Sequence, residues 1–162
     1  MTKKWVVNAS PLIVLARINH LFLLQRLAEE IVVPAGVAQE IAQGPEDDPA
    51  KEWLQTDGQA LVREVQVVPS VIIAWNLGSG ESEVLAWAYQ NPGYEAVLDD
   101  RAARNCALSL NIPVRGTIGV LLLAKRLGHL QLITPVLQQL EKAGFRIDPT
   151  VLSAAKKLAD ED

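Results

Sequence analysis

The chain has 162 residues, of which 49% are hydrophobic and 21% are charged. These values fit one folded domain with a substantial core, and they exclude a disordered chain. Fifteen Lys and Arg against 19 Asp and Glu give a net charge of −4, which argues against a protein that holds nucleic acid mainly by bulk positive charge. The apolar runs are too short to cross a bilayer. The single cysteine, Cys106, cannot form an internal disulfide and favours a cytoplasmic location.

Short strand patterns alternate with helix patterns from the beginning of the chain to its end. Strands are expected at 5–8, 31–33, 95–98 and 113–114, with further strand-like segments within 61–68. Helices are expected at 10–18, 20–29, 34–42, 48–55, 81–89, 101–110, 118–127, 135–143 and 150–158. Ser10 before Pro11 predicts a helix N-cap, Thr117 predicts another, and Gly128 predicts a helix end. This alternation predicts an α/β fold with a parallel sheet covered on both faces.

Polar side chains follow two of the predicted strands. Asn8 ends the first strand, and Asp99 and Asp100 follow the strand at 95–98. In parallel sheets, ligands bind beyond the carboxyl ends of the strands, so we expect these side chains to share one crevice. Glu81, in the first turn of the preceding helix, and Glu40, near the end of the helix at 34–42, add carboxylates. Such oxygen ligands suit Mg²⁺ or Mn²⁺.

Each of these residues also has a purely structural interpretation. Asp99 or Asp100 can serve as a helix N-cap, and Ser10 can do the same. Glu81 in a first helical turn complements the helix dipole, whereas Glu40 in a last turn does not. The metal-site hypothesis therefore depends on the joint placement of the residues rather than on any one of them.

A second spacing suggests a different site, a dinucleotide-binding unit of Rossmann type. Val71–Trp75 would be the strand, Gly78-Ser79-Gly80 the glycine turn, and Asp99 the acidic residue at the expected distance of about 20 residues. Glu83 occupies the third glycine position, where close helix–strand packing needs a very small residue. Glu81 and Glu83 would also lie beside the pyrophosphate, where negative charge is unfavourable.

Five stretches of the sequence resemble the PIN-like domain family, whose members include the ribonucleases of toxin–antitoxin pairs. They are VVNASPLIVLARI at 6–18, VVPAGVAQEI at 32–41, LGSGESEVLAWA at 77–88, VLDDRAARNCA at 97–107 and VRGTIGVLLLAKRLG at 114–128, and GFRID at 144–148 matches the family's usual tail. The resemblance spans nearly the whole chain. It implies one PIN-like domain over residues 1–162, with a small central parallel sheet between helices in three layers and a helical tail at 149–162.

The resemblance also implies a site. Its acidic positions fall on Asn8, Glu40, Glu81 and Asp100, with Asp99 adjacent. Glu81 and Asp100 would be metal ligands, Glu40 a ligand or an orienter of the attacking water, and Asp99 a helper or cap. Active members usually carry Asp where this chain has Asn8, which brings no charge and cannot act as a base.

The activity implied is cleavage of single-stranded RNA by an endoribonuclease that uses Mg²⁺ or Mn²⁺. Its expected partners are RNA, a small antitoxin protein and a second copy of the chain in a homodimer. The candidate substrate-binding residues are Ser10, Thr117, Arg101, Arg104 and Arg115, with Lys125 and Arg126 as further candidates for contacts with RNA phosphates. A catalytically inactive PIN-like module that binds RNA or protein is the main alternative, and Asn8 is its motivation.

Overall fold

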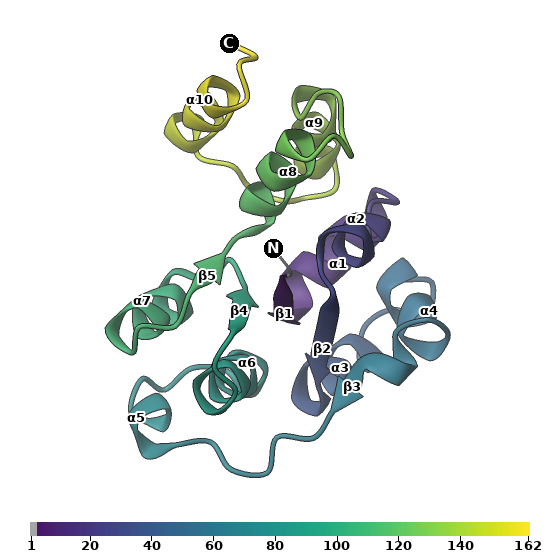
Figure 1. The fold of residues 1–162 in the computed structure, drawn as a ribbon. Helices are drawn as coiled ribbons and strands as arrows, with labels where there is room; N and C mark the ends of the chain where they lie inside the picture. The colour runs from purple at the N-terminus through teal and green to yellow at the C-terminus, as the bar shows by residue number, and fades with distance from the viewer. Residues whose placement is uncertain (1–2) are drawn as a thin grey trace.

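The computed structural model describes residues 3–162 (Figure 1). Its centre is a five-stranded sheet in the order β3-β2-β1-β4-β5, and every neighbouring pair is parallel. The strands are β1 Lys4–Val7, β2 Glu30–Pro34, β3 Val62–Arg63, β4 Tyr94–Val97 and β5 Val114–Arg115. β1 is the central strand, with Val6 opposite Val32 on one side and Ala96 on the other.

Helices form the two outer layers. They are α1 Ala9–Arg17, α2 Phe22–Leu27, α3 Ala35–Ala42, α4 Pro49–Gln55, α5 Ser70–Ile73, α6 Ser79–Gln90, α7 Arg101–Ser109, α8 Thr117–Arg126, α9 Thr134–Lys142 and α10 Pro149–Leu158, with a 3₁₀ turn η1 at Gln59–Leu61. Figure 1 shows α5 and α6 on one side of the sheet, and α2, α8 and α9 on the other. This arrangement confirms the three-layer α/β fold with a small parallel sheet.

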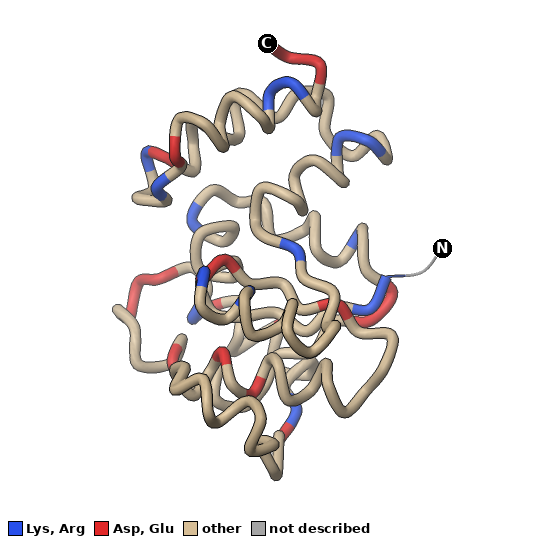
Figure 2. Tube along the Cα trace, turned by 90° about the vertical axis from the view of Figure 1, so that its left-hand side faces the viewer, with Lys and Arg blue, Asp and Glu red and all other residues tan. Residues whose placement is uncertain are grey.

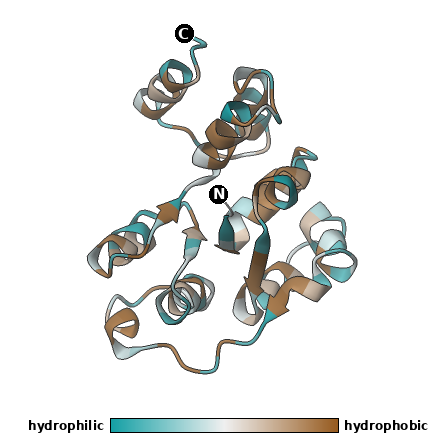
Figure 3. Cartoon of the chain, viewed as in Figure 1, coloured by the Kyte–Doolittle hydropathy of each residue, from teal (hydrophilic) through white to brown (hydrophobic). Residues whose placement is uncertain are grey.

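The core explains why the strands form where they do. Trp5, Val6 and Val7 of β1 are fully buried, and the apolar residues of β2 are buried as well. A strand that is buried on both faces needs a continuous apolar run rather than an alternating one, and both segments have such a run. Figure 3 shows the hydrophobic colouring of β2 in brown.

The structure limits one predicted strand and excludes the strand that the dinucleotide-binding alternative requires. Within residues 61–68, only Val62 and Arg63 form a strand, which pairs with the end of β2. Val71–Trp75 is not a strand, because α5 begins after Pro69 and only Ile72 of its apolar residues is buried. The dinucleotide-binding alternative requires a strand at this point, and the structure therefore removes its basis.

The helix starts were predicted with mixed success. Asp48 and Asp100 are N-caps, each accepting a hydrogen bond from a backbone N–H of its helix, and Gly128 follows α8 with φ +85°. Ser10 is not the N-cap of α1, because the helix starts one residue earlier and Asn8 occupies that position. Pro11 is tolerated inside the first turn because the first four N–H groups of a helix have no partner within it. Thr117 is likewise the first residue of α8, and Gly116 is at its N-cap position.

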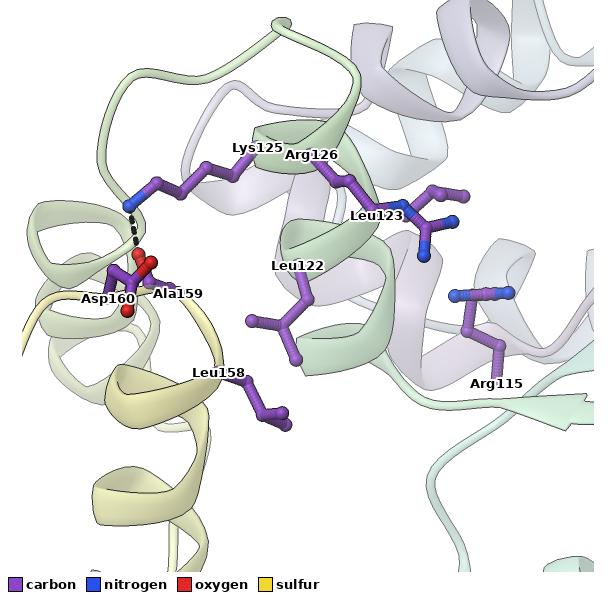
Figure 4. Close-up of a pocket in the computed structure, with 8 residues that line it drawn as sticks. All are labelled: Arg115, Leu122, Leu123, Lys125, Arg126, Leu158, Ala159 and Asp160. Atoms are coloured by element: carbon purple, nitrogen blue, oxygen red, sulfur yellow. Dashed lines mark hydrogen bonds between the residues drawn. The ribbon is translucent and has the colours of Figure 1, made fainter.

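A C-terminal latch, formed by Lys125, Ile133, Thr134 and Glu161, joins α8, α9 and the residues after α10. Glu161 accepts hydrogen bonds from Lys125 Nζ at 2.7 Å, from the Ile133 and Thr134 N–H groups at 2.8 and 2.9 Å, and from the Thr134 hydroxyl at 2.6 Å. Lys125 also donates to the Ala159 carbonyl (Figure 4). Burial acts to raise the pKa of Glu161, but these hydrogen bonds outweigh it and lower the pKa to about 2.

Candidate active site

The carboxyl ends of β1 and β4 lie at the topological switch point of the sheet. From β1 the chain crosses over to β2 on one side, and the later strands β4 and β5 extend the sheet on the other. The side chains that follow the carboxyl ends of β1 and β4 therefore meet at the place where such folds bind ligands. Asn8 follows β1, and its backbone N–H donates to the Val97 carbonyl at 3.0 Å. Asp99 and Asp100 follow β4 at the same edge.

Glu40 reaches this edge because of a glycine in α6. Gly80 is buried, and a Cβ atom on it would lie 3.2 Å from Glu40 Oε1 and 3.4 Å from Asn8 Oδ1. The absence of a side chain at Gly80 therefore lets oxygen atoms of α3 and of the residue after β1 converge on the first turn of α6. Asn8 is itself buried and makes no capping hydrogen bond to α1, which leaves its amide oxygen free for another partner.

Glu81 lies between two other carboxylates. Its pKa is raised from its ordinary value, first by burial and then by the negative charges of Asp100 and Glu40. Backbone N–H groups of Glu81 and Gly78 lower the pKa but do not compensate. Three carboxylates from α3, α6 and the start of α7 thus share one region, and their charges are not neutralised. We call Asn8, Glu40, Glu81 and Asp100 the carboxylate edge.

Asp99 and Asp100 are adjacent but have different surroundings. Asp100 is exposed, and its Oδ2 atom caps α7 through the Ala103 N–H at 3.0 Å. Asp99 accepts the Thr117 N–H at 2.8 Å and the Thr117 hydroxyl at 2.6 Å, one on each carboxylate oxygen. Thr117 is fully buried. Asp99 therefore connects the end of β4 to the start of α8, whereas Asp100 retains an oxygen without a capping bond.

Basic side chains gather beside this edge. A groove of about 1000 Å³ is bordered by four arginines, and we call it the arginine groove: Arg101, Arg104, Arg115 and Arg146. Arg104 donates to the Leu98 carbonyl at 3.3 Å, and Arg115 pairs with Glu95 at 2.9 Å. Three of these residues were predicted to bind substrate. Arg146 was not, because a single arginine in a short loop carries no sequence signal of its own.

The other predicted substrate-binding residues have different positions. Ser10 is exposed and borders a smaller pocket, of about 270 Å³, together with Glu40 and Arg17. Thr117 is buried, and its hydroxyl donates to Asp99. Acidic residues outnumber basic ones in the first part of the chain, and basic residues outnumber acidic ones in the rest; Figure 2 shows where both kinds lie. Residues 1–100 carry 14 Asp and Glu against six Lys and Arg, whereas residues 101–162 carry nine Lys and Arg against five Asp and Glu.

The donors of the carboxylate edge fit a hard divalent cation in their chemistry. Carboxylate and amide oxygens are the ligands that Mg²⁺ and Mn²⁺ prefer, and the raised pKa of Glu81 marks negative charge that a cation would neutralise. Among residues 3–162, no group of three or more His, Cys, Asp or Glu side chains is arranged to hold a metal ion. The edge therefore has the donor types of a metal site without a closed cage of ligands.

The parallel sheet, the helices on both of its faces and the carboxylates at its switch point define a three-layer α/β protein with an acidic site. A family model described as PIN domain matches residues 4–161, and this chain belongs to that family. Membership supports a nuclease-like fold and nucleic-acid binding in general. A comparison with curated proteins gave no match. Within residues 3–162, no helix has the length and apolar character needed to cross a membrane.

Proposed function

We propose that this protein is an endoribonuclease that cuts single-stranded RNA at the carboxylate edge with the help of Mg²⁺ or Mn²⁺. The observation that carries the proposal is the convergence of Glu40 and Asn8 oxygens on the first turn of α6 at Gly80, next to Glu81, whose pKa is raised by burial and by the charges of Asp100 and Glu40. Grouped carboxylates without a counter-charge cost free energy in a fold that needs only stability, so their presence at a switch point favours a function.

Each residue has a distinct proposed role. Glu81, Asp100 and Asn8 would hold the cation, and Glu40 would accept a hydrogen bond from the attacking water and orient it. A bound divalent cation would supply charge neutralisation at the scissile phosphate and make water more acidic. Asp99, whose two oxygens accept hydrogen bonds from Thr117, would hold Asp100 and α8 in place as a positioning residue.

Asn8 favours a second candidate function. Cation affinity depends on the number of charged ligands, and an amide in place of a carboxylate removes one charge. A PIN-like module that binds RNA or a protein partner without cutting RNA would tolerate this replacement. The two candidates differ in whether a divalent cation binds and whether RNA is cleaved.

The proposal extends to partners. By its resemblance to toxin ribonucleases, the protein would be controlled by a small antitoxin and would act as a homodimer. The leucines of α8 give the homodimer no support, because Leu121 and Leu123 are buried in the core and Leu122 is half-buried. Light scattering tests this part directly, and a monomer at micromolar concentration would contradict it.

The test of the main proposal is calorimetric titration with Mn²⁺, combined with a cleavage assay on single-stranded RNA. Wild type is compared with Asp100→Asn and with the control Asp47→Asn, which alters an exposed residue of the loop before α4. Asn is as good an N-cap as Asp, so α7 should remain folded. We expect saturable Mn²⁺ binding and cleavage in wild type and in the control, and the loss of both in Asp100→Asn.

Two results would overturn the proposal. Cleavage by Asp100→Asn at the wild-type rate would show that the reaction does not use the carboxylate edge. A wild-type protein that neither binds Mn²⁺ nor cuts RNA would instead support the binding module.

A further inference from the structure

The loop between α9 and α10 borders both the arginine groove and the pocket that contains Glu40 of the carboxylate edge. Gly144, at φ +98°, ends α9 and turns the chain. Gly144 and Phe145 border both the pocket that contains Glu40 and the arginine groove. Arg146 and Ile147 border the arginine groove. An RNA chain that runs along this loop from the carboxylate edge into the arginine groove would therefore pass over Phe145.

Two of the four arginines in the groove are free to bind a ligand. Arg104 and Arg115 already bond to Leu98 and Glu95. The side chains of Arg101 and Arg146 are exposed, and within residues 3–162 neither makes a hydrogen bond or an ion pair.

The acidic residues of the groove do not compete for these arginines. Asp99 accepts hydrogen bonds from Thr117, and Asp148 caps α10 through the Thr150 N–H at 2.8 Å. The groove therefore offers two uncommitted positive charges to an anion.

Apolar side chains border the same groove. Leu108 is 65% exposed and Val151 is 47% exposed, and the half-buried Phe145 and Ile147 line the groove with them. Cations beside apolar and aromatic surface form the arrangement by which proteins bind single strands, with phosphates on the cations and bases on the apolar groups. A duplex keeps its base faces stacked inside and cannot use the apolar surface in this way.

We propose that the α9–α10 loop guides single-stranded RNA from the carboxylate edge into the arginine groove. Arg146 and Arg101 contact backbone phosphates, and the ring of Phe145 supports one unstacked base. The inference rests on the proposed function, since it assigns the path of that substrate and makes Arg146 and Phe145 positioning residues outside the carboxylate edge.

The test measures binding apart from cleavage. A fluorescent 12-residue single-stranded oligoribonucleotide is titrated in EDTA, by anisotropy, at several salt concentrations. We expect Arg146→Ala to weaken binding about tenfold and to reduce the salt slope by about 0.7, the contribution of one phosphate contact on a single strand. Phe145→Leu, which keeps an apolar side chain, should weaken binding about tenfold through the loss of stacking. The control is Lys157→Ala, an exposed residue of α10, which should leave both the affinity and the slope unchanged.

The outcomes separate this inference from the proposed function. Arg146→Ala with wild-type affinity and salt slope would overturn the path, even if wild type cuts RNA with Mn²⁺. Loss of binding in Arg146→Ala supports the path, even if wild type never cuts RNA. Equal or tighter binding of a duplex of the same sequence would overturn the single-strand assignment, as would the absence of any RNA binding by wild type. Thermal melting of each variant checks that it is folded.

Discussion

Two glutamates of this protein have opposite electrostatic surroundings. Glu161, in the C-terminal latch, is surrounded by donors, and its pKa is lowered to about 2. Glu81, at the carboxylate edge, is partly buried near negative charges, and both effects raise its pKa. The first carboxylate stabilises the fold by satisfying N–H groups at the start of α9. The surroundings of Glu81 disfavour its ionised form. This carboxylate therefore adds nothing to stability unless a cation or a substrate supplies positive charge or hydrogen-bond donors.

Structural and functional carboxylates of this protein differ in how many hydrogen-bond donors already contact their oxygen atoms. A carboxylate whose oxygens are already saturated with donors has little capacity left for a ligand, as Glu161 and Asp99 show. A carboxylate whose few backbone hydrogen bonds do not offset burial and neighbouring negative charges has that capacity, as the raised pKa of Glu81 shows. Mutation of Glu81 should therefore mainly reduce RNA cleavage, whereas mutation of Glu161 should mainly reduce the free energy of unfolding.

Among the substitutions considered, Glu81→Gln should cause the greatest loss of RNA cleavage. The substitution removes a proposed metal ligand while keeping the size of the side chain. We expect RNA cleavage to fall by at least about 100-fold, the upper end of what changes to groups around a metal ligand cost.

Although Glu81→Gln should lose cleavage, its free energy of unfolding should increase slightly. Because the folded-state pKa of Glu81 is raised, its ionisation costs stability as pH rises through that pKa. At pH 7 the variant should be slightly more stable than wild type, by less than about 1 kcal/mol. A urea melt and a cleavage assay on the same sample check both effects, and lost stability together with unchanged cleavage would reverse our assignment.

The next largest effect is on the stability of Glu161→Gln. The amide cannot accept all the hydrogen bonds of the carboxylate and loses the ion pair with Lys125, so we expect the free energy of unfolding to fall by about 2 kcal/mol. Urea unfolding measures this loss, and Glu141→Gln, on the exposed side of α9, provides the control. Cleavage at saturating RNA should remain as in wild type.

The same substitution should also remove a pH dependence. The folded-state pKa of Glu161 is about 2, below the ordinary 4.5, so the folded state binds fewer protons between these values. Its contribution to stability is present above about pH 4.5 and is lost as pH falls towards 2. Wild type should therefore lose stability more steeply than Glu161→Gln in this range. Parallel profiles would contradict the role given to the latch.

Gly80→Ala should have a smaller effect on cleavage than Glu81→Gln. A Cβ atom at this position would lie 3.2 Å from Glu40 Oε1 and 3.4 Å from Asn8 Oδ1, so Glu40 must shift by a few tenths of an ångström. We expect cleavage to fall about tenfold, because small displacements of positioned groups reduce catalysis. Alanine is favoured over glycine inside a helix by about 1 kcal/mol, so thermal stability should not decrease. A variant that is destabilised but fully active would show that Gly80 serves packing alone.

The sequence predicted the fold and the placement of Asn8, Asp99 and Asp100 because these depend on local patterns. Buried parallel strands need continuous apolar runs, and residues that follow such strands lie at one edge. An apolar run alone does not predict a strand, because Val71–Trp75, the strand of the dinucleotide-binding alternative, begins as a short helix with one buried residue. Periodicity cannot distinguish the two over so few residues.

The remaining features of the site depend on contacts between distant segments. The role of Gly80 appears only once α3 packs beside α6, and Arg146 joins the groove only because the α9–α10 loop returns to the sheet. The hydrogen bonds of Asp99 to Thr117 join residues 18 positions apart. No local pattern in the sequence predicts that Asp99 is saturated while Asp100 is not.

The bond between Asp99 and Thr117 has a mechanical consequence. β5 contributes only two residues to the sheet, and the Asp99 carboxylate fixes the first residue of α8 beside the end of β4. Any sliding of α8 along the edge would break two hydrogen bonds and leave the buried Thr117 N–H unpaired, at a cost of about 1–3 kcal/mol. The groove formed by α7, α8 and the α9–α10 loop is thereby kept in a fixed position relative to the carboxylates, and no separate hinge is needed to align them.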